Sequence, residues 1–146
     1  MIKSVSLLAA ILVSATSFAS SSGPLLTKST GAGFVPPGLR HFTKCEIYTN
    51  KIVLTQGAEG VQSVQERQAA LTGLAEAIDG ASKGRIQEES APTDGPALVY
   101  TATKILPGDA TEKVDLGTYT GGDGKRTLNT SAAAQGLRNL ADMLCK

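Results

Sequence analysis

Two cysteines, Cys45 and Cys145, constrain the fold of this 146-residue chain more than any other feature, because they are 100 residues apart. Where disulfides can form, two cysteines most economically make one intramolecular bridge. Such a bridge would hold the end of the chain against the segment around Cys45, and the chain-entropy model assigns it about 4–5 kcal/mol. Two buried thiols, a crosslink between two copies and a reactive thiol are the alternatives. No Cys-x-x-Cys spacing is present, so a thioredoxin-like role has no support.

The first 19 residues have the three parts of a secretion signal. Lys3 supplies a positive start, residues 5–13 are almost continuously apolar, and Ser17 and Ala19 are small residues at positions −3 and −1 of a cleavage site. The apolar run is shorter than the about 20 residues that a membrane-spanning helix needs. A retained anchor or a buried N-terminal helix is the alternative. We expect a cleaved signal peptide and a soluble product that is secreted or periplasmic.

The charge balance and the rarity of metal ligands exclude several classes of function. The chain has 14 Lys and Arg against 13 Asp and Glu, and cleavage after Ala19 would remove Lys3 and no acid. A mature chain without net charge lacks the positive surplus that nucleic-acid binders and electrostatic membrane binders need. One histidine and two cysteines do not suffice for zinc fingers, Cys-ligated clusters or His-rich sites. We therefore predict no metal, no cofactor, no nucleic-acid partner and no integral membrane segment in the mature chain.

The next segment, residues 20–40, is rich in Ser, Gly and Pro, which suit neither a helix nor a central strand. It predicts a flexible tether, with Leu25, Leu26 and residues 34–35 as its only apolar points. A single disulfide-stapled domain is then expected over residues 41–146.

The first half of that domain is predicted to contain a β region, a helix and a loop. Residues 41–56 alternate with period two, which indicates one long strand or, as we favour, a hairpin that turns at residues 50–51. Apolar residues recur at helical spacing over residues 61–78, with Gly80 and Gly84 as stop signals. Residues 85–96 are predicted to be a polar loop.

The second half is predicted to contain three strands and a helix. Residues 97–106 and 112–120 form an antiparallel pair around a turn at 107–109, and residues 125–129 form a short third strand. Thr130 or Ser131 caps a helix over residues 132–144. The order β(β)-α-β-β-(β)-α predicts an α+β fold, a small antiparallel sheet with two helices packed on one face.

The candidate binding residues are three tyrosines and a glycine-rich turn. Residues 121–126 (Gly-Gly-Asp-Gly-Lys-Arg) could hold an anion through backbone N–H groups, although a hairpin turn accounts for every glycine. The tyrosines would form a small aromatic surface if the strand register aligns them. The candidates are Gly122, Lys125, Arg126, Tyr48, Tyr100 and Tyr119.

No convergent catalytic group is identifiable in the sequence. His41 is the only imidazole, so a Ser–His hydrolase would have to pair it with Ser82 or Ser131. Gly80 and Gly84 around Ser82 match the letters of a nucleophile elbow, but a helix is expected where that mechanism needs a strand. We therefore assign no catalytic residue. The first hypothesis is a non-enzymatic, exported binding module for a protein or envelope component, and the alternative is a small secreted hydrolase that uses His41 with a serine nucleophile.

Overall fold

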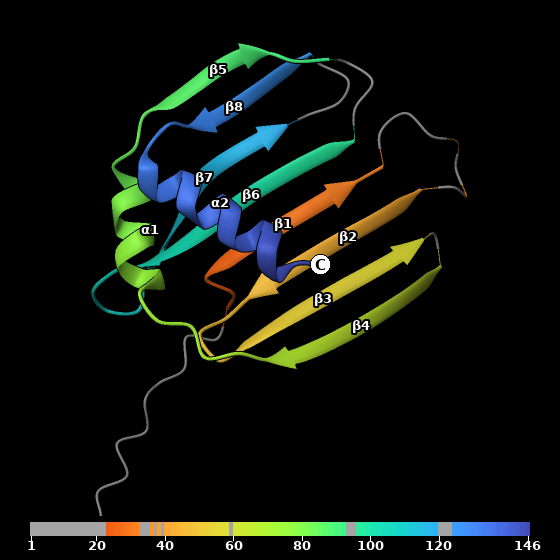
Figure 1. Ribbon diagram of the computed structural model, residues 1–146, viewed down its shortest axis with the longest axis horizontal. Coiled ribbons are helices and arrows are strands. Elements are labelled where there is room, and N and C mark those ends of the chain that lie inside the picture. The colour runs from red at the N-terminus through yellow and green to blue at the C-terminus, as the bar shows by residue number, and fades with distance from the viewer. Residues whose placement is uncertain are drawn as a thin grey trace, which may run out of the picture.

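In the part of the chain that the structure describes, the fold is a single antiparallel sheet with two helices on one of its faces (Figure 1). The computed structural model describes residues 23–32, 36, 38, 40–58, 60–92, 96–119 and 124–146. The strand order is β4-β3-β2-β1-β6-β7-β8-β5, and every neighbouring pair is antiparallel. The predicted α+β class, with both helices on one face, is confirmed, but the sheet has eight strands and is larger than expected. Within the described residues, no helix has the length and apolar character required to span a bilayer.

The elements follow one another along the chain as two runs of four strands, each followed by a helix. They are β1 (Leu26–Gly31), β2 (His41–Ile47), β3 (Lys51–Ala58), β4 (Val61–Gln68), α1 (Leu74–Ser82), β5 (Ile86–Ser90), β6 (Ala97–Ile105), β7 (Thr111–Tyr119), β8 (Lys125–Asn129) and α2 (Ala132–Leu144).

The first correction concerns residues 20–40, which contain a central strand in place of a continuous tether. β1 lies between β2 and β6, and Leu26 in it is fully buried. The prediction failed because glycine and proline flank this strand or end it, so the average composition concealed a six-residue segment that suits a sheet. The compact fold therefore begins before Arg40. The predicted signal peptide, residues 1–19, lies outside the described residues.

The second correction concerns residues 61–78, where a strand and a later helix replace the single predicted helix. β4 occupies the first part, and α1 begins only after Gly73, whose φ of 77° marks the helix start. Val61 and Val64 are 73% and 63% exposed, so they do not form the buried stripe that helical spacing suggested. The apparent period joined residues of two different elements.

The third correction concerns residues 85–96, in which β5 replaces part of the predicted polar loop. β5 is an edge strand that pairs only with β8 among the described residues, and most of its side chains are exposed. Its polar composition reflects the open edge, where Glu88 and Glu89 form ion pairs with Lys125 and Arg126.

The remaining elements confirm the predictions closely. β2 and β3 form the favoured hairpin, although Tyr48 N donates to Lys51 O, so the turn lies one residue earlier than expected. β6, β7, β8 and α2 lie at the predicted places, and Ser131 caps α2 by accepting a hydrogen bond from Ala134 N.

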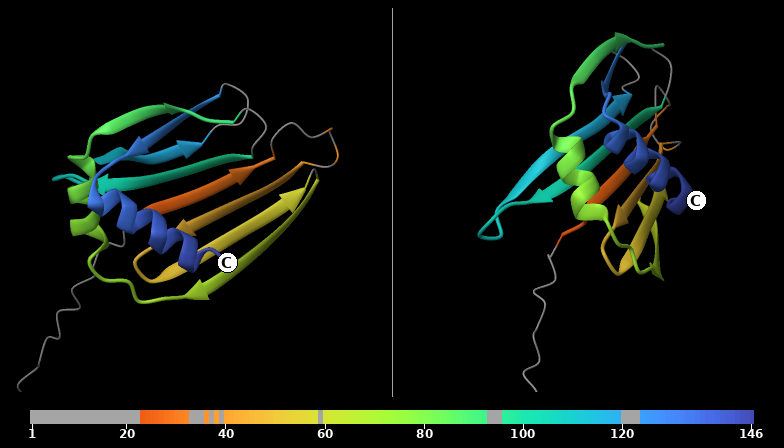
Figure 2. Two further views of the ribbon diagram at one scale, coloured as in Figure 1. Left: turned by 45° about the horizontal axis from the view of Figure 1, so that its top comes forward. Right: turned by 60° about the vertical axis from the view of Figure 1, so that its left-hand side comes forward.

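Both helices lie over one half of the sheet (Figure 2), and the apolar core lies between them and that half. α1 packs on β6 and β7, and α2 packs on β1 and β7. The register aligns one apolar residue from each of five adjacent strands under the helices: Ile52, Ile47, Leu26, Ala102 and Val114.

The end of α2 is held to the sheet twice. Cys45, which is fully buried in β2, forms the predicted disulfide with Cys145, and the two Cα atoms are 5.8 Å apart. Arg67 of β4 also donates a hydrogen bond to the carbonyl of Leu144. Both contacts fix α2 across the sheet, and the disulfide is compatible with an oxidising extracellular compartment.

Asn129 joins both helices to the sheet. Its side chain is 1% exposed, and its Nδ2 donates to the carbonyls of Ala81 in α1 and Asp115 in β7. Its Oδ1 accepts hydrogen bonds from the backbone N and Oγ of Ser131 at the start of α2. A buried amide is stable here because both of its donors and its acceptor have partners.

Candidate functional site

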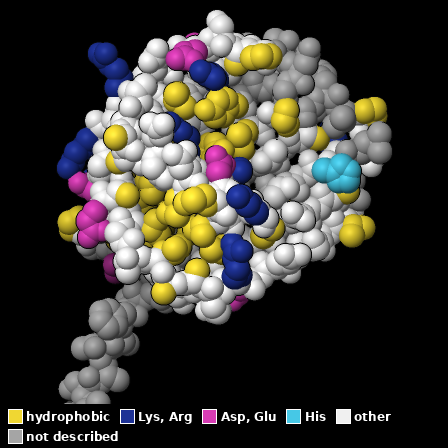
Figure 3. Space-filling view, in the orientation of Figure 1, with side chains coloured by type: hydrophobic (Ala, Val, Ile, Leu, Met, Phe, Trp, Pro, Cys, Tyr) yellow, Lys and Arg dark blue, Asp and Glu magenta, His cyan; other side chains and the backbone are white. Residues whose placement is uncertain are grey.

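The helices cover only the half of the sheet nearest α1, and the other half of the same face forms a shelf (Figure 1). The strand register places one residue of every strand in a row on this uncovered half, on the same side as the helices. We call this row the shelf: Ser63, Gln56, Thr43, Thr30, Leu98, Tyr119, Arg126 and Glu89. Figure 3 shows much of this half in white, the colour of uncharged polar side chains and backbone.

The part of the shelf on β1 to β4 consists of hydroxyl and amide groups. Thr30, Thr43, Gln56 and Ser63 follow one another across four strands. Hydroxyl and amide groups both donate and accept hydrogen bonds, so this row can pair with a ligand of either kind. It ends in a hollow of about 370 Å³, which His41 and Val61 also line.

The part of the shelf on β6, β7, β8 and β5 contains an aromatic ring and a neutralised charge. The guanidinium of Arg126 lies 5.6 Å from the ring centroid of Tyr119, and its Nε donates to Glu89 Oε2 at 2.8 Å. Leu98 adds an apolar side chain that packs against the core margin. This end therefore offers contact area without net charge.

A second polar network closes the shelf on the side of α2. Tyr100 Oη donates to Asp142 Oδ1 at 2.7 Å, and Lys28 Nζ lies 2.7 Å from the same oxygen. Burial, followed by the hydrogen bond to Asp142, raises the pKa of Tyr100 above its usual range. Partial burial opposes ionisation of Asp142, but the hydrogen bonds from Lys28 and Tyr100 outweigh it and lower its pKa. The side of the shelf next to α2 is thus a network of hydrogen bonds and ion pairs in which the charges of Lys28 and Asp142 are paired.

The structure brings together three of the predicted site residues, Tyr100, Tyr119 and Arg126, and places Tyr48 apart from them. Tyr119 pairs with Leu98 and Tyr100 pairs with Gly117, so the two tyrosines are diagonal neighbours on the helix side, next to Arg126. Tyr48 follows β2 near α1, where its ring lies 5.3 Å from the Lys51 ammonium.

One further predicted residue, Lys125, lies next to the shelf. Lys125 forms an ion pair with Glu88 at 3.0 Å, and both residues are adjacent in sequence to shelf residues. Gly122 lies outside the described residues.

The hydroxyl and amide residues of the shelf were not predicted from the sequence. Thr30 falls in the segment expected to be a tether, and Ser63 falls in the segment expected to be a helix. No residue type marks them as a site, because threonine and glutamine are common on exposed sheets. Only the register of four strands identifies them as neighbours.

His41 is far from both serines that the hydrolase hypothesis required. Ser131 follows β8, and three strands separate β8 from β2, which contains His41. The distance from His41 to Ser131 across the sheet is therefore about 19 Å or more. Ile47 of β2 and Ala102 of β6 both pair with Leu26, so they lie at the same level along the strands. His41 is six residues before Ile47 and therefore lies about 20 Å from that level. Ser82 lies beyond Ala102, near Lys104, so the imidazole reaches neither hydroxyl.

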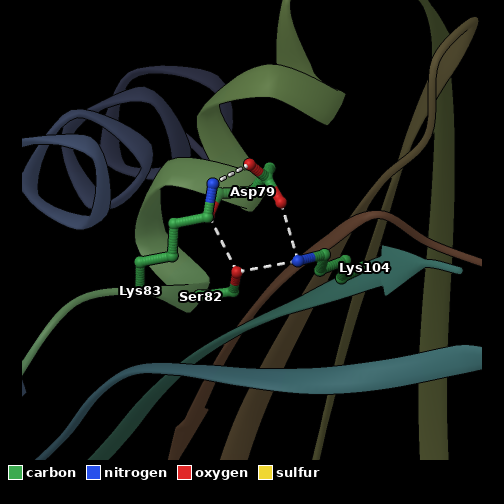
Figure 4. A network of polar contacts seen from close by, with 4 residues as sticks. All are labelled: Asp79, Ser82, Lys83 and Lys104. Atoms are coloured by element: carbon green, nitrogen blue, oxygen red, sulfur yellow. Dashed lines mark hydrogen bonds and ion pairs between the residues drawn. The ribbon is translucent and has the colours of Figure 1, made fainter.

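Ser82 instead belongs to an ionic network at the end of α1 (Figure 4). Its hydroxyl donates to the carbonyl of Asp79 at 2.7 Å and accepts from Lys104 Nζ at 3.1 Å. The Asp79 carboxylate lies 2.7 Å from both Lys104 and Lys83, whose hydrogen bonds lower its pKa to about 2. The hydrogen bond to Asp79 raises the pKa of Lys104, which favours the charged form that donates to Ser82.

No group of three or more His, Cys, Asp or Glu side chains suited to a metal ion occurs in the part of the chain that the structure describes. Comparisons of the chain with protein-family models, with curated proteins and with solved structures found no match.

Proposed function

We propose that this protein is a non-enzymatic binding module whose shelf receives an extended, uncharged segment of a partner protein. The observation that carries the proposal is the continuous row of hydrogen-bonding side chains that α1 and α2 leave uncovered. We further propose that the module acts after export, as a secreted or periplasmic protein with a cleaved signal peptide. The Cys45–Cys145 disulfide supports this location, because such bonds persist in oxidising compartments.

The dimensions of the shelf suit a polypeptide in extended conformation. Eight adjacent strands span about 34 Å from the first to the last, since neighbouring strands lie about 4.8 Å apart. An extended chain of about ten residues has this length. Its alternating N–H and C=O groups would meet the hydroxyls of Thr30, Thr43 and Ser63 and the amide of Gln56, which can donate or accept as needed.

The charges of the shelf favour an uncharged segment. Arg126 is paired with Glu89, and Lys28 is paired with Asp142, so neither cation is available as an isolated partner for a carboxylate or a phosphate. A charged ligand would have to break one of these ion pairs, or its own charge would remain unpaired on the shelf. Either outcome costs free energy when the surface is partly desolvated by the bound ligand. Polar and small apolar side chains fit without such a penalty.

The test uses peptides selected from a phage library of random sequences of about ten residues. Synthetic peptides from the enriched clones are titrated into the oxidised protein by calorimetry, and Thr43→Lys is compared with Thr55→Lys. Both threonines are partly buried on adjacent strands, but Thr55 pairs with Lys44 on the opposite face. We expect Thr43→Lys to weaken binding by about tenfold or more, because it places a charge in the shelf, and Thr55→Lys to have little effect.

Amide shifts measured by NMR provide the second readout. Binding along the shelf should perturb Thr30, Thr43 and Gln56 on three neighbouring strands. The proposal fails if no peptide is enriched, if the perturbed amides cluster on the other face, or if Thr55→Lys abolishes binding while Thr43→Lys does not.

A further inference from the structure

β4 is an open edge of the sheet. Among the described residues it pairs with β3 alone, and it forms the last strand at one side in both views of Figure 2. All eight of its residues are exposed, including Val61 at 73% and Val64 at 63%. An exposed, regular edge strand presents unpaired backbone groups that can pair with another strand.

The hydrogen-bond pattern identifies which residues of β4 direct their backbone groups outward. Ala69 N donates to Asn50 O, which makes these two residues a hydrogen-bonded pair at the end of the β3–β4 ladder. Paired and unpaired positions alternate along an antiparallel ladder. Arg67, Gln65, Ser63 and Val61 therefore bond to β3. The outward groups belong to Gln62, Val64, Glu66 and Gln68.

β4 lacks the features that usually protect an edge strand. It contains neither proline nor lysine, and its register with β3 has no shift, whereas β6 and β7 contain a bulge. Its two charged side chains are engaged within the chain, because Glu66 binds Lys51 at 3.2 Å and Arg67 donates to the Leu144 carbonyl. The opposite edge, β5, has five residues and carries two adjacent glutamates.

We propose that β4 pairs in antiparallel orientation with β4 of a second copy of this chain, so that two copies share one sheet of sixteen strands. A residue whose backbone N–H and C=O point outward must lie opposite such a residue of the second copy. Only registers that pair Gln62, Val64, Glu66 and Gln68 with one another are therefore possible. With Val64 opposite Val64 of the second copy, Gln62 faces Glu66 and Ser63 faces Gln65. No like charges are opposed, and two exposed valines become each other's neighbours.

The adjacent registers are less favourable. If the second copy is shifted by two residues in one direction, Val64 lies opposite its Glu66. A carboxylate then lies against an apolar side chain at two symmetric positions. A further shift in that direction opposes the two Glu66 carboxylates, which repel each other. A shift in the other direction shortens the paired stretch. The pairing at Val64 is therefore the self-complementary one.

The dimer goes beyond the proposed binding function and does not depend on it. Residues directly opposite in an antiparallel pair lie on the same face of the sheet, so the helices of both copies lie on one side. The two Ser63 residues are then offset by two positions, about 7 Å along the strands. Two shelves would thus approach each other at the joined edge.

The test is sedimentation velocity of the oxidised protein over concentrations from about 5 μM to 1 mM, a range that covers weak and moderate dimers. We expect a concentration-dependent dimer. Val64→Pro removes one outward N–H per copy without removing a bond to β3, and should weaken the dimer by about 30-fold. Ile86→Pro in β5 is the matched control, since Thr130 N donates to Arg85 O and the Ile86 N–H therefore also points outward. This control should leave the dimer unchanged.

Two charge variants test the register while leaving the backbone intact. Gln62→Glu should weaken the dimer because it opposes Glu66 of the second copy, and Gln62→Lys should strengthen it by adding an ion pair at each symmetric position. A monomer at all concentrations overturns the proposal, as does a dimer that Ile86→Pro disrupts and Val64→Pro does not. Equal effects of the two Gln62 variants would overturn the register. None of these outcomes alters the peptide test of the shelf.

Discussion

Replacing Asn129 with alanine should lower the free energy of unfolding by about 3–4 kcal/mol, although the change removes few atoms. The side chain donates to the carbonyls of Ala81 and Asp115 at 2.9 and 3.1 Å. It also accepts from the N and Oγ of Ser131 at 3.1 and 2.8 Å. Four hydrogen bonds at a net of about 1 kcal/mol each set the upper value, and the Ser131 hydroxyl recovers part of it by rotation. At 1% exposure, water cannot replace the lost partners without opening the core.

Asn129→Asp separates this explanation from a simple loss of volume. The aspartate has the same shape, but it places an ionised oxygen where Nδ2 now faces two carbonyl oxygens. We therefore expect Asn129→Asp to be less stable than Asn129→Ala at neutral pH, and to recover partly in acid, where a protonated carboxyl can donate one hydrogen bond. Asn139, exposed on α2, is the matched control, and both of its substitutions should change stability by about 0.5 kcal/mol or less.

Urea unfolding followed by circular dichroism measures these differences, provided that the slope with urea is unchanged among the variants. The reasoning is refuted if Asn129→Ala behaves like the Asn139 control. It is also refuted if Asn129→Asp equals the wild type at neutral pH, since the two donated hydrogen bonds would then contribute nothing.

Four further outcomes are expected. Replacing both cysteines with serine should lower the free energy of unfolding by about 4–5 kcal/mol, because the bridge closes a separation of 100 residues; an unchanged urea midpoint would contradict this. Asp79→Asn should be less stable than the wild type near neutral pH, and the difference should shrink as the pH falls below about 4 toward 2. The reason is that the folded state lowers the pKa of Asp79 to about 2, so its ionised carboxylate stabilises the fold at neutral pH, and this stabilisation is lost as the carboxyl is protonated in acid. A stability difference that stays undiminished at the lowest pH would contradict this. Gly57→Ala should destabilise the sheet by about 1–3 kcal/mol, because an added Cβ would lie 2.7 Å from the Phe42 ring. Gly136→Ala, where nothing lies within 4 Å, should stabilise α2 by about 0.5–1 kcal/mol, and thermal unfolding distinguishes the two substitutions.

Features with a local cause were predictable from the sequence. β8 and α2 have the predicted bounds, because a glycine-rich turn sequence precedes the strand and Ser131 caps the helix by accepting a hydrogen bond from Ala134 N. The disulfide was predictable because two cysteines allow only one intramolecular pair. β6 and β7 were predictable because the composition of residues 97–106 favours a strand, residues 112–120 alternate, and a turn signal lies between them.

The position of β1 and the nature of β4 could not be predicted in the same way. β1 is stabilised by pairing with β2 on one side and with β6, more than 60 residues later, on the other, and neither partner is visible in its own composition. Val61 and Val64 are three residues apart, which is typical of a helix, but an exposed edge strand imposes no burial pattern.

The shelf shows most clearly which features depend on the sequence alone and which depend on the tertiary structure. The sequence by itself determined which residues favour strands, where the last helix begins and which sulfurs can join. Only the tertiary structure placed Thr30, Thr43, Gln56 and Ser63 in one row, because that alignment depends on the order and register of four strands. Order and register follow from hydrogen bonds between distant segments and from the common burial of one face, and neither is a property of any single segment.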